Sequence, residues 1–326
     1  MTPGVTDRWW RQLPDGKPIS ALGFGCSSLW ATPNFVEERA AALLAALAAE
    51  GVNHFDTGPS YGKGLGERRL GAFLAGRDAG SFVISTKVGT NLVDGRLVRG
   101  FSRAPIERSF RDSLRRLGLA RVDVLYLHGP ALADLNDAVY GFFADMKAEG
   151  LIGFSGVNSF DNAVLTRVAC SPIDAAMLQL NVADFRNWDV SETLHAAGKL
   201  VFSGTALGRS AFDPWRFLRP GRGNLWYLLR MLRHNPRSFL GSRALRGELE
   251  ALAPTPHDAA ITFMVGNPRL VSSLFGTSSL AHAVANARSG HAVPAAPYWR
   301  RTADALCHLN GLASRSDQFA GSEDFV

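Results

Sequence analysis

Short apolar segments that alternate with amphipathic segments constrain the fold of this chain more than any other feature. Eight apolar runs of four to six residues are each followed by a stretch with helical spacing. Continuous apolar runs are typical of strands that are covered on both faces. Strands that alternate with helices run parallel through right-handed crossovers, and eight such units favour a closed (β/α)8 barrel over an open sheet. The expected strands are residues 21–25, 52–55, 82–86, 122–127, 152–155, 175–178, 200–203 and 271–275.

The helices between these strands are predicted from apolar residues three and four positions apart and from glycines that end them. Residues 36–50 show both signals, because an apolar stripe there is followed by Gly51. A hairpin is expected in residues 8–20, around the turn signal Pro14-Asp15-Gly16, and a long loop is expected between residues 86 and 105. The expected helices are residues 36–50, 67–74, 105–117, 134–149, 161–169, 190–197, 256–265, 280–287 and about 302–309.

Composition favours one large domain in a reducing compartment. The chain has 326 residues, 46% of them hydrophobic, which is enough for a single barrel core. No apolar run approaches the roughly 18 residues that cross a bilayer, and residues 1–12 lack a hydrophobic signal segment. The three cysteines are far apart and form no disulfide or zinc pattern. We therefore expect one cytoplasmic domain over residues 1–326, with no membrane partner.

The positive charge is concentrated in one segment. The net charge is +6, yet residues 209–246 hold nine arginines and a single acid, Asp213. A local excess of this kind argues against general nucleic-acid binding and for one element that attracts anions. We interpret residues 205–246 as a lid insertion that is either a solvated basic surface or a contact for a cofactor pyrophosphate or an anionic substrate. Residues 297–326 form a C-terminal tail.

Ionisable side chains follow three consecutive predicted strands. Asp56, Lys87 and His128 stand at the ends of the second, third and fourth strands, and Tyr61 follows in the Gly/Pro-rich loop of residues 57–66. Each has an ordinary interpretation when it is taken alone, such as a loop cap, a surface lysine or a satisfied core histidine. In a barrel, however, the carboxyl ends of neighbouring strands meet at the active-site face, so these side chains are expected to converge.

The convergence predicts proton donation to an oxygen. A tyrosine, with a pKa near ~10, becomes a usable acid–base group if a lysine cation lowers that value and a carboxylate holds the lysine. His128 would donate a hydrogen bond to the same substrate oxygen. Carbonyl reduction by a cofactor hydride is such a reaction. His54 shares the strand face of Asp56, but no further ligand set accompanies the pair, so no metal is expected. A Schiff-base aldolase using Lys87 and a non-catalytic cofactor-binding regulatory protein remain alternatives.

Three motifs resemble the aldo-keto reductase superfamily. They are Gly-Val-Asn-His-Phe-Asp-Thr-Gly-Pro-Ser-Tyr-Gly at residues 51–62, Leu-Arg-Arg-Leu-Gly-Leu-Ala-Arg-Val-Asp-Val-Leu-Tyr-Leu-His at 114–128, and Ile-Ser-Thr-Lys-Val-Gly at 84–89. The resemblance implies a catalytic tetrad of Asp56, Tyr61, Lys87 and His128. Tyr61 would be the general acid/base, and His128 would orient the carbonyl of an aldehyde, ketone or sugar. It also implies NADPH or NADH as cofactor.

Positions that would hold the cofactor carry over with changes. At residues 156–160 the family's Ser-Asn pair is reversed to Asn-Ser, and Gly276 and Ser278 stand where the family has a cation for the 2′-phosphate, which leaves His282 as a candidate cation. On family grounds NADPH is slightly preferred. Aromatic residues Trp30, Phe101 and Trp226 are candidates for a pocket that suits a bulky, partly apolar substrate. The implied cofactor residues are Asn158, Ser159, Gln179, Leu207, Gly208, Arg209, Gly276, Thr277, Ser278, His282 and Asn286.

Overall fold

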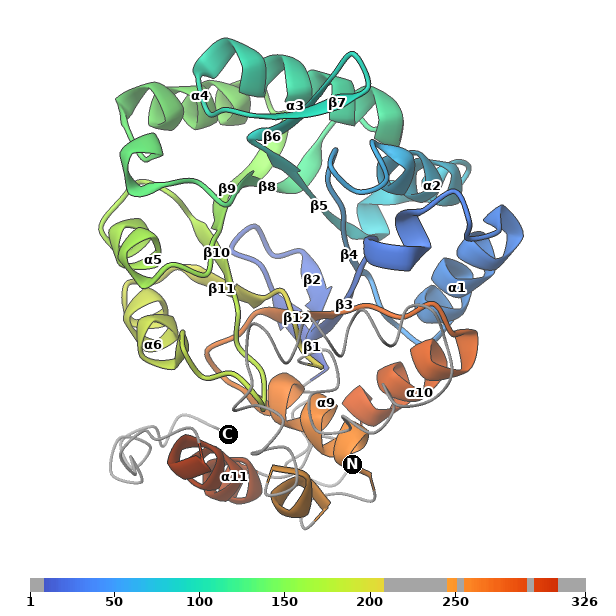
Figure 1. Cartoon of the computed structure of the whole chain (residues 1–326), viewed down its shortest axis with the longest axis vertical. Helices are drawn as coiled ribbons and strands as arrows, with labels where there is room; N and C mark the ends of the chain where they lie inside the picture. The colour runs from blue at the N-terminus through green and yellow to red at the C-terminus, as the bar shows by residue number, and fades with distance from the viewer. Residues whose placement is uncertain (1–8, 208–244, 251–254, 292–295, 310–326) are drawn as a thin grey trace.

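Eight parallel strands close into a barrel, and helices surround it (Figure 1). The structure is a computed structural model that describes residues 9–207, 245–250, 255–291 and 296–309. The strands follow one another around the barrel in chain order, and β12 pairs with β3 to close it. The predicted (β/α)8 fold is therefore confirmed. The barrel strands are β3 (Leu22–Gly25), β4 (His54–Asp56), β5 (Val83–Val88), β8 (Val122–His128), β9 (Ile152–Asn158), β10 (Ala175–Leu178), β11 (Leu200–Ser203) and β12 (Ser272–Phe275).

The surrounding helices also match the sequence pattern. Gly118 ends α3 in the left-handed conformation, with φ of 65°, as its position after the apolar stripe indicates. The last helix begins earlier than expected, at residue 296 rather than near 302. Within the described residues, the helices that correspond to the predicted ones are α1 (Glu37–Ala49), α2 (Leu65–Leu74), α3 (Arg103–Leu117), α4 (Asp137–Ala148), α5 (Asn162–Ala169), α6 (Trp188–Ala196), α9 (Pro256–Gly266), α10 (Leu280–His291) and α11 (Ala296–Leu309).

Two hairpins lie outside the barrel sheet. Strands β1 (Trp10–Gln12) and β2 (Pro18–Ser20) form the predicted N-terminal hairpin, and its Leu13 and Ile19 pack into the apolar cluster inside the barrel. The prediction of a long irregular loop after β5 is wrong. The segment contains an antiparallel hairpin of β6 (Thr90–Val93) and β7 (Arg96–Arg99). Asp94-Gly95 at its tip is a typical two-residue hairpin turn.

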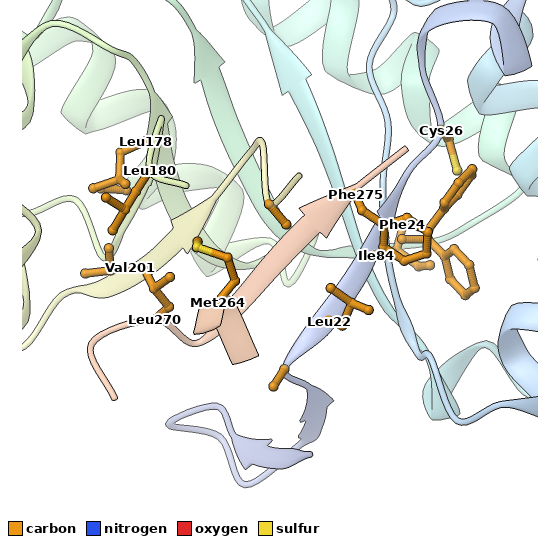
Figure 2. Packing of buried hydrophobic residues seen from close by; sticks show 14 of the residues in the cluster. Leu22, Phe24, Cys26, Ile84, Leu178, Leu180, Val201, Met264, Leu270 and Phe275 are labelled. Carbon is orange, nitrogen blue, oxygen red and sulfur yellow. The ribbon is translucent and has the colours of Figure 1, made fainter. Parts of the chain in front are cut away.

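Alternation along the strands separates two apolar layers. Leu22 and Phe24 of β3 face outward into the larger apolar cluster, which also contains Met264 of α9, and the Phe24 ring packs against Phe275 (Figure 2). Inside the barrel, Tyr126 and Phe202 pack edge to face with ring centroids 6.1 Å apart. Because side chains alternate between faces, the inward set of each strand can be identified from one member.

The C-terminal helix α11 packs on α9. Trp299 is buried, donates a 2.8 Å hydrogen bond to the carbonyl of Phe263, and stacks on Trp188 and Phe263. Residues 297–309 of the predicted tail therefore adjoin the barrel through this helix. Within the described residues, none of the helices is both long and apolar enough to cross a bilayer.

Candidate active site

A buried ion pair joins the ends of β4 and β5. His54 and Asp56 share one face of β4, and Ser85 and Lys87 share the face of Val83 on β5. Both faces are the barrel interior, because Val83 belongs to the inner apolar cluster and the His54 ring contacts Phe202 of that cluster. Lys87 is 1% exposed and Asp56 3% exposed, and the ammonium pairs with the carboxylate. The ammonium also donates a 2.9 Å hydrogen bond to the carbonyl of Thr57. A buried charge is tolerated only with such partners, so each residue of this pair requires the other.

Hydrogen bonds continue from Asp56 into the barrel. The Ser85 hydroxyl donates to Asp56 Oδ1 at 2.7 Å and lies 3.4 Å from His54 Nε2. Because Ser85 gives its single hydroxyl proton to Asp56, its oxygen is left as an acceptor for an Nε2–H of the neutral His54 ring, and in that tautomer Nδ1 accepts from Ser272 Oγ at 2.9 Å. Burial and the Lys87 charge lower the pKa of His54 to about 3, so the ring is neutral at pH 7. The Asp56 carboxylate is thereby held on two sides.

Tyr61 is carried over the ion pair by the loop that follows β4. Gly62 has φ of 59° and lies so close to the carbonyl of Ala31 that a side chain there would collide with it. The Lys87 ammonium lies 5.0 Å from the centre of the Tyr61 ring. Burial raises the pKa of the Tyr61 phenol, the Lys87 charge opposes this, and Asp56 adds to it. The expected lowering by lysine is thus outweighed, and the phenol is a protonated donor at neutral pH.

His128 at the end of β8 faces the tyrosine. The rings of Tyr61 and His128 meet edge to face, with centroids 6.0 Å apart and an interplanar angle of 79°. Burial, followed by the charges of Lys87 and Arg99, lowers the pKa of His128 to about 4. Nδ1 of His128 is buried and has no hydrogen-bond partner within the described residues. A neutral imidazole and a protonated phenol therefore stand next to each other, a pair of groups that suits an oxygen that takes up a proton.

Amide side chains lie at the ends of the next strands. Asn158 at the end of β9 donates to the carbonyl of Met177 at 3.2 Å, and the Ser159 amide nitrogen donates to the same carbonyl at 3.0 Å. Gln179 follows β10, and its Nε2 donates to Asp184 Oδ2 at 2.7 Å. Each Asn or Gln side chain thus has its amide nitrogen fixed, which orients the carbonyl oxygen as an acceptor.

The predicted adenosine-side residues gather between β12 and α10. Thr277 and Ser278 lie in the connecting loop, where they are partly exposed, and Gly276 is exposed. On α10, His282 is exposed while Asn286 is buried. These positions form one neighbourhood, as the motif requires.

A small cavity adjoins that loop. It has a volume of about 80 Å³, and Ser278 and Arg39 stand on its wall. Arg39 on α1 is a cation that the sequence pattern did not connect with this loop, because helix α1 lies more than 200 residues away in the chain. The remaining lining residues are Phe35, Ala42, Leu43 and Leu280.

Other predicted contacts fall in different places. Leu207 is partly buried, whereas Gly208, Arg209 and most of the 205–246 insertion lie outside the described residues. Trp226 lies outside them too. No group of three or more histidine, cysteine, aspartate or glutamate side chains within the described residues is arranged to hold a metal ion.

The two described pocket aromatics differ. Trp30 is 2% exposed, and its indole N–H faces the carbonyl of Ala40 at 3.4 Å. It is therefore a core residue and does not lie on a pocket surface. Phe101 lies against Gly89 at the base of the β6–β7 hairpin. Of these two aromatic residues, Phe101 is therefore the one that stands near the end of β5.

The geometry is matched by similarity to known proteins. A family model described as the aldo/keto reductase family matches residues 21–297. The chain belongs to the aldo/keto reductase family. A solved aldo-keto reductase from Bacillus halodurans, in its holo form, superposes with a TM-score of 0.75 at 25% identity over 92% of this chain and 95% of that chain.

Curated relatives match this chain over shorter spans. D-threo-aldose 1-dehydrogenase from a Pseudomonas species is 35% identical over 176 residues, which are 47% of this chain and 54% of that protein. Pyridoxine 4-dehydrogenase from Escherichia coli is 26% identical over 278 residues, 82% of this chain and 87% of that protein. In the first of these matches, the chain spans about half the length of its relative.

Sequence reasoning missed Ser85 as a member of the site. It is neither ionisable nor at a strand end, so it lacks both signals that mark Asp56, Lys87 and His128. Strand alternation was the available signal, since Ser85 lies two residues before Lys87 and so shares its inward face. His54 shares the strand face of Asp56, as the sequence indicates, but its link to Asp56 through Ser85 depends on the β4–β5 register, with Asp56 opposite Ser85.

Proposed function

We propose that this protein is an NAD(P)H-dependent oxidoreductase that interconverts the carbonyl of an aldehyde, ketone or sugar with the corresponding alcohol. The observation that carries the proposal is the buried Lys87–Asp56 pair beneath a protonated Tyr61, with the His128 ring edge-on to the phenol. Membership of the aldo/keto reductase family supports the same reaction class.

Each member of the tetrad has a role that follows from its surroundings. The Tyr61 hydroxyl gives its proton to the carbonyl oxygen as negative charge develops there, and takes it back in the alcohol-to-carbonyl direction. Burial alone would lower the pKa of Lys87, but Asp56 and then Tyr61 raise it, so the ammonium stays charged and stabilises the phenolate that Tyr61 becomes. Neutral His128 donates a hydrogen bond that orients the carbonyl.

The residues around the mouth fit a nicotinamide cofactor. The amides of Asn158 and Gln179 have their nitrogens fixed and their oxygens available to a carboxamide, and Asn286 with the β12–α10 loop would hold the adenosine end. When bound, such a cofactor supplies the hydride that the side chains lack. Ser278 and Arg39 on one cavity wall support a slight preference for NADPH, since a cation and a hydroxyl suit a phosphate.

Substrate class rests on the relatives. The names D-threo-aldose 1-dehydrogenase and pyridoxine 4-dehydrogenase describe dehydrogenases of a sugar and of a small hydroxylated ring compound. Small polyhydroxylated or aromatic alcohols and their carbonyl forms are therefore the first compounds to test.

A Schiff-base aldolase on the same barrel is disfavoured. Schiff-base formation requires a neutral amine, whereas Asp56 keeps the pKa of Lys87 above its ordinary value. Borohydride trapping with a carbonyl substrate would distinguish the two, because an aldolase would be inactivated covalently.

The test has two stages. Binding of NADPH and NADH is measured first by quenching of protein fluorescence. Oxidation of the bound cofactor is then followed at its absorbance band against aldehydes, ketones and sugars. The proposal expects saturable binding and carbonyl-dependent oxidation. A different result would instead support a regulatory protein of the same fold: the cofactor binds, but no carbonyl compound oxidises its reduced form and no alcohol reduces its oxidised form.

A further inference from the structure

The β6–β7 hairpin is anchored at the mouth of the barrel. The chain leaves the end of β5 at Gly89 and returns at Gly100, where the Gly100 amide nitrogen donates to the carbonyl of Gly89 at 3.0 Å. Phe101 lies so close to Gly89 that a side chain there would collide with its ring. Arg99, the last residue of β7, is therefore held beside the end of the strand that bears Lys87.

The Arg99 guanidinium extends towards the end of β8. Its central carbon lies 5.8 Å from the centre of the Phe101 ring. A β-carbon built on Gly129 would lie 3.5 Å from its Nη2, and Gly129 directly follows His128. The guanidinium is close enough to help lower the pKa of His128. Arg99 thus stands next to the residue that orients the carbonyl.

Within the described residues, Arg99 has no carboxylate partner. Of the acids on this hairpin and its neighbours, Asp56 pairs with Lys87, Asp145 pairs with Arg103, and Asp134 accepts from the Ala131 amide nitrogen. Asp94 lies at the hairpin turn, at the opposite end from Arg99. Arg99 is exposed, yet it stands beside the buried ion pair of Lys87 and Asp56, so a positive charge without a carboxylate partner faces a ligand that enters there. Such a charge attracts an anion to the mouth.

We propose that Arg99 binds an anionic group of the substrate, so that the preferred substrates are carbonyl compounds with a carboxylate or phosphate a few carbon atoms from the carbonyl. The inference rests on the proposed carbonyl reduction and names its substrate class. Arginine suits this role because its planar fork can donate two parallel hydrogen bonds to a carboxylate or a phosphate. Phe101 beneath the guanidinium would keep the fork facing the mouth.

Matched substrates test the proposal. Steady-state kcat/KM is measured for 4-carboxybenzaldehyde and for methyl 4-formylbenzoate, which keeps the shape and removes the charge. The variants are Arg99→Gln, Arg99→Lys and Arg96→Gln, the last at the opposite end of β7, where Arg96 pairs with Val93 next to the turn. Succinic semialdehyde and its methyl ester form a second, aliphatic pair.

The selectivity ratio of acid over ester decides the outcome. Wild type should prefer the acid, and Arg99→Gln should reduce the ratio by about 10- to 100-fold, the range of one charge-assisted hydrogen bond. Arg99→Lys should retain part of the preference, Arg96→Gln should retain all of it, and added salt should reduce it in wild type. A ratio near one in wild type, or a ratio unaffected by Arg99→Gln, would overturn the role of Arg99 while turnover of the ester upheld the reductase. No turnover of any carbonyl compound would overturn both.

Discussion

Inside the barrel, a hydrogen-bonded polar group on β4 and β5 contrasts with an aromatic pair formed by Tyr126 of β8 and Phe202 of β11. His54 and Asp56 form a continuous hydrogen-bonded column with the serine and lysine of β5. Across the barrel, Tyr126 and Phe202 pack edge to face. Desolvating the charged column costs free energy that the aromatic side does not require. Under the proposed function the column serves proton transfer, so the two sides should respond differently to substitution.

The largest effect is expected from Lys87→Met. Removing the ammonium removes the charge that stabilises the Tyr61 phenolate, so kcat should fall by about 10²- to 10⁴-fold. Because Asp56 would be left buried and unpaired, the free energy of unfolding should also fall, by about 3–5 kcal/mol. The double variant Lys87→Met/Asp56→Leu separates the effects: denaturant unfolding should show recovered stability while kcat stays low. Recovered turnover would remove Lys87 from the mechanism.

The apolar side should show the reverse behaviour. Phe202→Ala leaves a cavity inside the barrel, and the free energy of unfolding should fall by about 3–5 kcal/mol. At a temperature where the variant is folded, kcat should change much less than in Lys87→Met. Phe24→Ala, in the outer layer, is the matched control and should lose similar stability. If Phe202→Ala lowered kcat as much as Lys87→Met does, the claim that the two sides of the barrel respond differently to substitution would be wrong.

Acid should weaken the fold through the buried histidines. The pKa of His54 is about 3 and that of His128 about 4, both below the unfolded value near ~6.5. Between these values the unfolded chain binds more protons, so stability is full above pH ~6.5 and decreases as pH falls, by about 1.4 kcal/mol per pH unit for each histidine. Urea unfolding at several pH values measures the slope. His54→Asn should reduce it, and an unchanged slope would mean that His54 is not buried neutral.

The smallest effect is expected from Ser85→Ala. It removes one hydrogen bond to the Asp56 carboxylate, so kcat should fall by about tenfold. Ser191→Ala provides the control, because Ser191 is also buried but donates to the carbonyl of Trp188 in α6. Steady-state kinetics of both variants make the test. Equal effects on kcat would show that the column does not act on the site.

The sequence predicts which residues stand at strand ends, but it does not predict how deeply their side chains are buried. Asp56, Lys87 and His128 were found because a barrel brings consecutive strand ends together, whatever the side-chain packing. The direction of the Tyr61 pKa could not be found in this way, since it depends on burial outweighing the lysine charge. Trp30 was misplaced for the same reason, because an aromatic residue in a loop has no sequence signal that separates core from pocket.

One structural feature that was not predicted does have a signal in the sequence. The β6–β7 hairpin has an Asp94-Gly95 turn between two short runs with apolar residues, but flanking arginines concealed the strands. The proximity of Arg39 to Ser278 could not be predicted from the sequence, because α1 and α10 become neighbours only when the barrel closes between β12 and β3.

Tyr61→Phe tests the central claim most directly, because it removes only the hydroxyl that is assigned to proton transfer. Cofactor binding is measured first, and the rate of hydride transfer to an aldehyde is then followed in a single turnover of the pre-bound enzyme. We predict that the cofactor still binds and that the rate falls by about 10²- to 10⁴-fold. A single-turnover rate within a few fold of wild type would contradict the assignment of Tyr61 as the general acid.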